Sequence, residues 1–399
     1  MAEKRRPSVL VIAYACSPQM GSEHGAGWGV VTALMEFAAV TVLTGSRHID
    51  EIRDWERRNP ESKATFVEVP DRILGPRVRW HRVPEFLHYL TWLRRAGKKA
   101  RHLIVDGHYD VAFHATFSAF WLPTPAVNLG LPSVWGPVGG AVTTPKPLLK
   151  LLGFAGIVQE VLDYASVRLM AALPSPRRTA LAATERILQN EDTRAMLPPA
   201  ARGRTRIVNH ALFSVIPQFP AEPDGGYVLW VSPMESRKGP QLALEALSRT
   251  GDHVHLKMVG DGPQRKRLER AATDMGIAER VTFTGLVPRD EAVRLMRGAS
   301  TVLFTGLREE GGLALAEAMY AARRVIVLDH GGAGAIARSA TDPSRVALIA
   351  PDDVGTTASR LAEAIEDHLA ATPVSDKPLL DRAGAVTELA AAVEAARHS

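Results

Sequence analysis

The sequence predicts an α/β protein built from two doubly wound domains, and three observations support this. Strand-like and helix-like runs alternate along the whole chain, which is typical of helices packed on mostly parallel sheets. A proline- and glycine-rich stretch interrupts the alternation near the middle, and 399 residues are more than one ordinary core requires. We expect the two domains to face each other across a cleft at the carboxyl ends of their strands, where function should lie.

Residues 1–215 are expected to form the first domain. Its short apolar runs are predicted strands, at residues 8–14, 40–43, 65–69, 111–114, 133–135, 186–188 and 206–208. Its longer runs are predicted helices, at residues 28–37, 49–58, 84–104 and 148–183, the last with a break at two prolines.

Residues 216–226 are the predicted hinge, because three prolines are followed there by Asp224-Gly225-Gly226. The alternation then restarts in a predicted second domain, residues 227–375. Its predicted strands lie at residues 227–231, 253–259, 281–283, 301–304, 325–328 and 346–349. Its predicted helices lie at residues 241–247, 264–275, 291–297, 313–322 and 356–369. Residues 376–399 are Ala-rich and are expected to form a helix that packs back near the hinge.

The composition is that of an ordinary soluble protein, with 46% hydrophobic and 23% charged residues. Cys16 is the single cysteine, so no internal disulfide can form. No run supports a membrane span, because four charged residues interrupt the most apolar stretch. The basic residues and apolar run at the N-terminus resemble a short secretory signal, but a strand that opens an α/β domain explains them as well. We expect a cytoplasmic protein, with the inner face of the membrane as a variant of that location.

Positive charge is concentrated in residues 72–102, where nine Lys or Arg stand against one acid. The local net charge is +8, which leaves the rest of the chain near −3. The segment could bind an anionic acceptor or lipid headgroups as a peripheral membrane contact, or it could be a solvated basic helix face. A nucleic-acid-binding domain is not expected.

A strand-to-helix turn at Gly311-Gly312 is the most informative stretch. The first N–H groups of a helix, here from Leu313 onward, lack internal partners and attract anions, and glycines let a phosphate approach the backbone closely. Glu309 and Glu317 frame this turn, and a carboxylate beside phosphate is costly unless it faces hydroxyl groups. The combination indicates a ligand with both phosphates and sugar hydroxyls, a sugar nucleotide.

Four motifs in sequence order carry a resemblance to a known family. They are Glu309-x-x-Gly312-x-x-x-x-Glu317, Ser236-Arg237-Lys238-Gly239, Val259-Gly260-Asp261-Gly262-Pro263 and Phe283-Thr284-Gly285-Leu286-Val287-Pro288. Together they resemble the E-x-x-G-x4-E signature, the Lys-Gly element, the G-x-G-P turn and the base-binding loop of the family-4 retaining glycosyltransferases, the glycosyl transferases group 1. That family has the GT-B fold of two Rossmann-like domains, with the acceptor held by the N-terminal domain and the nucleotide sugar by the C-terminal domain.

The resemblance implies a role for each matching residue of the second domain. Lys238, helped by Arg237, would neutralise the departing phosphate, and Glu309 would contact the transferred sugar. Glu317 would accept hydrogen bonds from the ribose, and Glu310 would point away from the ligand. Gly260, Leu286, Gly311, Gly312 and Leu313 would complete the donor site. No cofactor or metal is expected, because the chain has no Asp-x-Asp pair, and the donor nucleotide, UDP, GDP or dTDP, stays open.

The first domain matches the family more loosely. Gly25 and Gly27 lie in a glycine-rich run, residues 21–28, that resembles a loop near the donor phosphates, although the run could also be a turn that merely needs glycine. Residues 136–140 resemble a second such loop. His114 ends a predicted strand and matches a histidine thought to contact the donor sugar, with a histidine satisfied by a backbone carbonyl as the alternative.

One position departs from the family pattern. Relatives place an arginine five residues before the lysine, and Pro233 stands there in this chain. Proline cannot contact phosphate, so two alternatives stay open beside retaining, metal-independent sugar transfer to an acceptor hydroxyl. One is a nucleotide-sugar-binding partner protein without turnover, and the other is a GT-B sugar-nucleotide epimerase. The acceptor, whether a small molecule, a glycan or a lipid-linked sugar, is not specified by the sequence.

Overall fold

The computed structural model describes residues 5–19, 22–71, 85–214, 222–371 and 377–399. Residues 72–84 of the basic segment, Gly21 of the glycine-rich run and residues 216–221 of the predicted hinge lie outside this part of the chain. The chain divides into two compact units. Unit 1 comprises Met1–Ala141, Val167–Val215 and Arg382–Ser399, and unit 2 comprises Val142–Ser166 and Ile216–Asp381.

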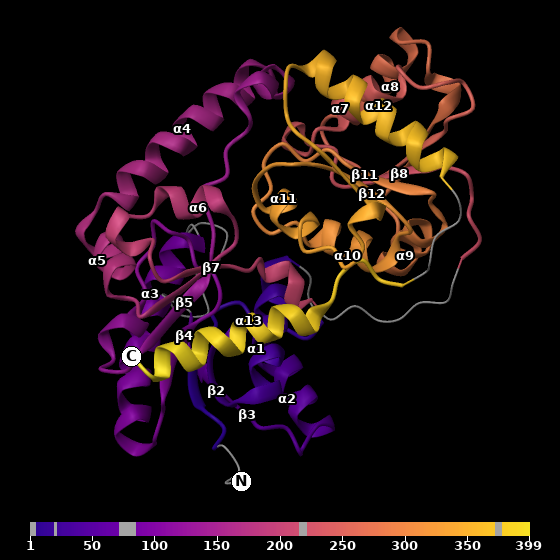
Figure 1. Ribbon diagram of the computed structural model, residues 1–399. Helices are drawn as coiled ribbons and strands as arrows, with labels where there is room; N and C mark the ends of the chain where they lie inside the picture. The colour runs from indigo at the N-terminus through magenta and orange to yellow at the C-terminus, as the bar shows by residue number, and fades with distance from the viewer. Residues whose placement is uncertain (1–4, 20–21, 72–84, 215–221, 372–376) are drawn as a thin grey trace, which may run out of the picture. The chain divides into compact units, whose positions relative to one another are not determined.

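Unit 1 is organised around a parallel sheet that has seven strands within the described residues, in the order β3-β2-β1-β4-β5-β6-β7 (Figure 1). The strands are β1 Ser8–Ile12, β2 Ala39–Gly45, β3 Ala64–Val69, β4 Val111–His114, β5 Ser133–Val138, β6 Glu185–Leu188 and β7 Thr205–Ile207. Central β1 reads as a continuous apolar run because helices cover both faces of such a sheet, and Val9 to Ile12 are fully buried.

The helices of unit 1 follow the predicted alternation, except that the first begins earlier and the short helix Glu191–Met196 was not predicted. They are α1 Ser22–Phe37, α2 Ile49–Arg58, α3 Glu85–Asp106, α5 Pro174–Ala182, α6 Glu191–Met196 and α13 Arg382–Arg397. Helix α1 begins six residues earlier than predicted, so Gly25 and Gly27 lie in a helix and not in a loop. A Cβ at Gly27 would lie 2.0 Å from the Ala15 carbonyl oxygen. The glycine therefore allows α1 to pack closely against the segment after β1.

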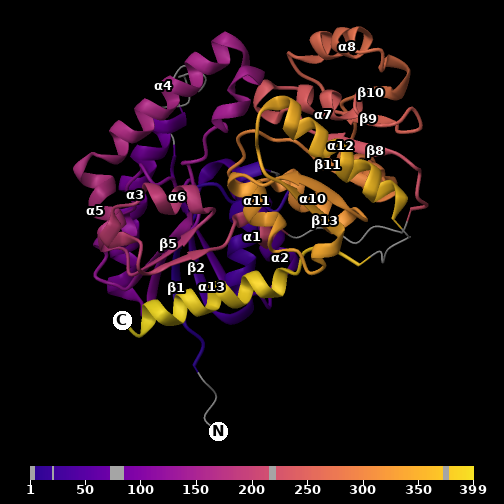
Figure 2. The same ribbon diagram turned by 45° about the horizontal axis from the view of Figure 1, so that its top comes forward.

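Unit 2 repeats the plan with a sheet that, in the described part of the chain, has six parallel strands in the order β10-β9-β8-β11-β12-β13 (Figure 2). The strands are β8 Val228–Val231, β9 Leu256–Val259, β10 Val281–Gly285, β11 Thr301–Phe304, β12 Val325–Leu328 and β13 Val346–Ile349. The helices are α7 Pro240–Leu247, α8 Arg265–Asp274, α9 Arg289–Gly298, α10 Leu313–Ala321, α11 Gly331–Ala337 and α12 Val354–Ala370. The predicted α/β class, with two doubly wound parallel sheets, is confirmed.

The unit boundaries differ from the predicted domain boundaries in two places. Residues 142–166 belong to unit 2, because Leu148, Leu151 and Leu152 of a 3-10 helix, Lys146–Leu152, are buried in the unit 2 core. Helix α4, Gly153–Ala171, follows directly and contains the boundary between the units. The last helix, α13, belongs to unit 1, where it packs against α1 and the Arg382 guanidinium donates to the Phe213 carbonyl oxygen at 3.2 Å.

Candidate active site

The loops that follow the strands of the unit 2 sheet bring the predicted donor-site residues to one edge. Lys238 follows β8, Gly260 follows β9, Leu286 follows β10 and Glu309 follows β11. These four strands are parallel neighbours in the sheet, so their carboxyl ends lie along the same edge. The chain order of the strands reverses between β8 and β11, and such a switch point is where open α/β sheets bind ligands.

Lys238 and Glu309 meet at this switch point. The Lys238 ammonium forms an ion pair with Glu309 Oε1, and the two side chains are only 14% and 9% exposed. Gly239 is required beside them, because its φ is +64° and a Cβ would lie 2.2 Å from the Thr305 carbonyl oxygen. A partly buried pair of opposite charges is stable only while both partners are present, so a phosphate that binds Lys238 must replace Glu309 as its counter-charge or join it.

The turn after Glu309 has the geometry that the glycines predict. Gly312 has a φ of +50°, in the left-handed region, and it precedes the first residue of α10, Leu313. The Glu309 carbonyl oxygen accepts a hydrogen bond from the Gly332 N–H at 2.8 Å, which ties the turn to the start of α11. The N–H groups at the start of α10, which have no acceptor within the helix, therefore lie within a few residues of the ion pair.

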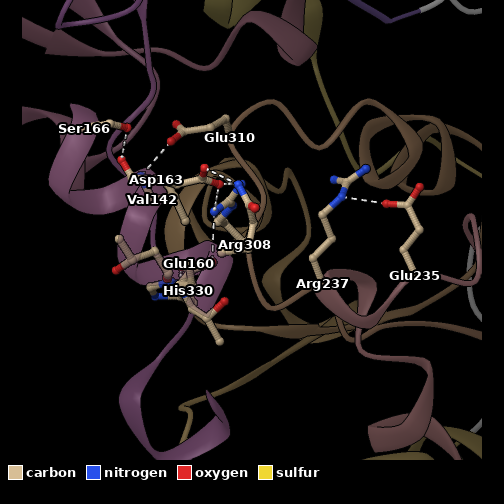
Figure 3. A network of polar contacts seen from close by, with 12 residues as sticks. Val142, Glu160, Asp163, Ser166, Glu235, Arg237, Arg308, Glu310 and His330 are labelled. Atoms are coloured by element: carbon tan, nitrogen blue, oxygen red, sulfur yellow. Dashed lines mark hydrogen bonds and ion pairs between the residues drawn. The ribbon is translucent and has the colours of Figure 1, made fainter. Parts of the chain in front are cut away.

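Helix α4 and the segment before it contact the two residues next to Glu309 (Figure 3). The Arg308 guanidinium donates to Glu160 at 2.9 Å and to Asp163 at 3.3 Å, and both carboxylates come from α4. Glu310 points toward the segment before α4, where its Oε1 accepts from the Val142 N–H at 2.6 Å. The residues on both sides of Glu309 are thus fixed to residues 142–166. We refer to these three contacts as the turn clamp.

The Arg237 side chain is not part of the turn clamp (Figure 3). Its guanidinium donates to Glu235 at 2.7 Å, and the two side chains are 45% and 39% exposed. Its carbonyl oxygen accepts the N–H of Leu307 at 2.9 Å, so the backbone of Arg237 supports the acidic turn. Pro233 lies in the same loop after β8. Whether the Arg237 side chain replaces the arginine missing at Pro233 stays a prediction.

Glu317 has a partner that the sequence analysis did not include. Arg289, at the start of α9, donates to Glu317 Oε1 through Nε at 3.0 Å and Nη2 at 2.7 Å. The Arg289 side chain is 60% exposed, so this ion pair is weak and can be exchanged for hydroxyl groups of a ligand.

The remaining donor-site residues lie on the β9 and β10 loops. Gly260 has a φ of +128°, and a Cβ there would lie 2.0 Å from the Ser232 carbonyl oxygen, so glycine allows the β9 loop to touch the β8 loop. Leu286 is 81% exposed, which is unusual for leucine and suits contact with a flat apolar ligand surface. A cavity of about 420 Å³ adjoins the β9 turn, and it is lined by Asp261, Gly262, Pro263, Arg265, Lys266 and Glu269.

His114 is placed in the core of unit 1. It ends β4 as predicted but is 1% exposed, and its Nε2 lies 3.0 Å from the Tyr89 hydroxyl. Burial lowers the pKa of His114 to about 3, so the ring is neutral at physiological pH. A hydrogen bond with the backbone of Thr116 partly offsets this lowering, so the alternative of a histidine satisfied by a backbone carbonyl stays open, and contact with a donor sugar stays a prediction.

Glu23 is a further polar residue that sequence reasoning missed. Its Oε1 accepts a hydrogen bond from the Phe117 N–H at 2.7 Å, and Phe117 has a φ of +51°, an uncommon conformation for a residue other than glycine. The contact joins α1 to the loop after β4. Only the position of Glu23 inside the glycine-rich run could have indicated it. Glu160 and Asp163 appeared in the sequence solely as charges that interrupt an apolar run.

Within the described residues, no group of three or more His, Cys, Asp or Glu side chains is arranged to hold a metal ion. None of the helices in the same part of the chain combines the length and apolar character needed to cross a membrane.

Comparisons with known proteins show which family the C-terminal half of the chain is similar to. Residues 215–376 match the family model described as glycosyl transferases group 1. The 2-deoxystreptamine glucosyltransferase of Streptomyces kanamyceticus is 31% identical over 148 residues, which are 36% of this chain and 38% of that protein. The chain spans about a third of the length of the curated relatives that it matches.

Solved structures match nearly the whole chain. The complex of Anabaena Alr3699/HepE with UDP and glucose has a TM-score of 0.54 at 15% identity and covers 97% of this chain and 99% of that one. The lipopolysaccharide outer core galactosyltransferase WaaB has a TM-score of 0.57 at 13% identity and covers 96% of this chain and 95% of that one. These likenesses confirm the predicted GT-B fold.

Proposed function

We propose that this chain, whose residues 215–376 belong to the glycosyl transferases group 1 and whose fold is GT-B, transfers a sugar from a nucleotide-sugar donor to an acceptor hydroxyl. The observation that carries the proposal is the Lys238–Glu309 ion pair at the switch point of the unit 2 sheet, beside the Gly311-Gly312 turn. This arrangement places a cation and unpaired helix N–H groups near an acid. A sugar nucleotide requires the first two for its phosphates and the acid for its hydroxyl groups.

In the proposed reaction, the bond between the anomeric carbon and the β-phosphate oxygen breaks and negative charge grows on that oxygen. The Lys238 ammonium and the N–H groups at the start of α10 would stabilise this charge, and stabilisation by fixed groups needs no reorganisation. Glu309, released from Lys238 as the phosphate binds, would accept hydrogen bonds from the sugar hydroxyls. The acceptor oxygen then bonds to the anomeric carbon, and its proton passes to the departing phosphate oxygen, so that nucleoside diphosphate is released.

The proposal also includes the stereochemistry, the absence of a metal and the roles of individual residues, which the resemblance of the motifs supports. We propose retention of the anomeric configuration, no metal, ribose binding by Glu317, base contact by Leu286, and donor contacts from Gly25, Gly27 and Arg237. UDP is one candidate nucleotide, because a structural neighbour was solved with UDP and glucose. The acceptor would be held by unit 1, and the chain would act in the cytoplasm or at the inner face of a membrane.

The test is release of nucleoside diphosphate from a panel of UDP-, GDP- and dTDP-linked sugars, with and without candidate acceptors. We expect slow release without acceptor, faster release with the right acceptor, and strong dependence on Lys238. Lys266, on α8 at the neighbouring cavity, offers the matched control, because Lys266→Met removes an equal charge without touching Glu309.

Two other results would replace this proposal. Tight binding of a nucleotide sugar without turnover under any acceptor would favour the binding-partner function that Pro233 suggests. Isomerised donor would favour a GT-B epimerase.

A further inference from the structure

Helix α4 carries a stripe of exposed apolar side chains along one face. Phe154 is 85% exposed and Leu169 is 71% exposed, and Val158, Val161 and Leu162 of the same helix are exposed as well. At 100° per residue these five side chains fall within an arc of roughly 100°, so they share one face. We call these five residues the α4 stripe. Soluble proteins rarely leave so many large apolar side chains together in water.

The contacts of α4 with the rest of unit 2 come from another side of the helix. Glu160 and Asp163 bind Arg308 from that side, and Ile157 packs against the unit 2 core. Glu160 is the buried residue of α4, so these contacts, and not the α4 stripe, define the side of the helix that faces unit 2. Its orientation is fixed by the charged contacts on the other side.

Basic residues outnumber acids in the stretch of chain that contains the stripe. Five basic residues lie between residues 142 and 182, all with exposed side chains: Lys146, Lys150, Arg168, Arg177 and Arg178. The same stretch contains two acids, Glu160 and Asp163, and both are bound to Arg308. A helix with an apolar stripe and basic flanks is complementary to an anionic lipid surface, where the apolar side chains enter the headgroup boundary and the cations remain near phosphate.

We propose that the α4 stripe docks the protein on anionic phospholipid bilayers, with α4 lying in the plane of the membrane. The proposal does not depend on sugar transfer. It also differs from the sequence-based expectation that residues 72–102 contact the membrane, because it assigns the contact to another helix. The described part of that basic segment is in α3, which exposes two large apolar residues, Leu87 and Val105, on its surface.

The first experiment is co-sedimentation of the full chain with vesicles of phosphatidylcholine alone or mixed with phosphatidylglycerol. We expect binding to the mixed vesicles that weakens as salt is raised. The double variant Phe154→Ser/Leu169→Ser should lower the partition coefficient at least about tenfold, because two large apolar side chains no longer leave water. The matched control, Leu87→Ser/Val105→Ser, removes the same number of exposed apolar residues from α3 and should change little. Circular dichroism verifies that both variants remain folded.

The second experiment tests directly whether α4 contacts the membrane. Cys16 is the single cysteine and is 1% exposed, so an environment-sensitive thiol dye should react with Phe154→Cys and not with the unaltered chain. We expect a blue shift of the dye on anionic vesicles. Binding that is unchanged by Phe154→Ser/Leu169→Ser, with no shift of the dye, would overturn the proposal. No vesicle binding, but dimers in sedimentation velocity that disappear in the same variant, would overturn it too and assign the stripe to a second copy of the chain.

Discussion

The two sheets of this protein reverse their strand order at equivalent places, yet different side chains gather there. In unit 1 the reversal lies between β1 and β4, where buried, neutral His114 meets Tyr89. In unit 2 it lies between β8 and β11, where Lys238 pairs with Glu309 beside a glycine turn.

The same strand arrangement therefore carries different side chains in the two units, and these side chains differ in their chemistry. Burial favours the uncharged form of a histidine, so His114 itself supplies no positive charge to the unit 1 site. The unit 2 site keeps a cation and an acid only partly buried, each as the other's counter-charge. We expect a departing phosphate to find its positive charge at Lys238 in unit 2.

The largest expected effect comes from Lys238→Met. If this ammonium stabilises the leaving phosphate, turnover should fall on the order of 10²–10³-fold, which is typical for loss of one preorganised group. Initial rates of nucleoside diphosphate release measure it, with Lys266→Met as the control. Because Lys238→Met leaves Glu309 without its counter-charge, the double variant with Glu309→Gln separates lost stability from lost chemistry. A fall of less than threefold in a folded protein would contradict the role.

His114→Gln should change stability rather than chemistry. The unfolded chain protonates this histidine near its ordinary pKa of 6.5, whereas the folded unit does so only near pH 3. Between these values the unfolded state binds more protons, so the free energy of unfolding falls as pH is lowered, by about 1.4 kcal/mol per pH unit. The variant should lose this slope in unit 1.

Hydrogen exchange of peptides from β4, followed between pH 6.5 and 4, measures that slope. Peptides from unit 2 are the internal control, since burial lowers the pKa of His368 to about 4 there and the variant leaves it unaltered. If His114→Gln instead reduced turnover as much as Lys238→Met, His114 would contact the donor sugar as the sequence predicted.

The turn clamp should have an intermediate effect. Arg308→Met frees the residues next to Glu309 from α4, and we expect kcat to fall about tenfold with KM nearly unchanged, because the acid is misplaced and not removed. Glu160→Gln should act through the same contact. A double-mutant cycle tests this: additive losses would mean that the two residues act separately.

The smallest effect is expected from Arg289→Met. This exposed ion pair is worth at most about 1 kcal/mol, so freeing Glu317 should tighten nucleotide binding by less than about fivefold. Calorimetric titration with the free nucleoside diphosphate measures it. Arg294→Met removes a similarly exposed arginine of α9 from its pair with Glu291 and should leave binding unaltered. Weaker binding after Arg289→Met would mean that Arg289 itself contacts the nucleotide.

Much of unit 2 was predictable because its information is local. The predicted strand at 325–328 coincides with β12, and the helix predicted from the Gly311-Gly312 turn begins at Leu313. Alternating runs and glycine turns are read within a few residues, and parallel strands then place their loops on one edge without further information.

The parts that could not be predicted depend on distant residues. Arg308 and Glu160 are 148 positions apart, and Tyr89 and His114 combine a helix and a strand that no pattern connects. The start of α1 was missed for another reason. Three glycines in residues 21–27 indicate a loop locally, but close packing of Gly27 on Ala15 stabilises a helix.

Unit 2 consists of two separate segments of the chain. This limits which fragments the protein could exchange with its relatives by recombination. A recombination event that transferred residues 215–376 alone would leave behind Leu148, Leu151 and Leu152, which belong to the unit 2 core. It would also separate Arg308 from Glu160. An inherited or engineered chimera would therefore have to carry residues 142–166 together with the C-terminal half, so the unit of inheritance is larger than the contiguous family domain.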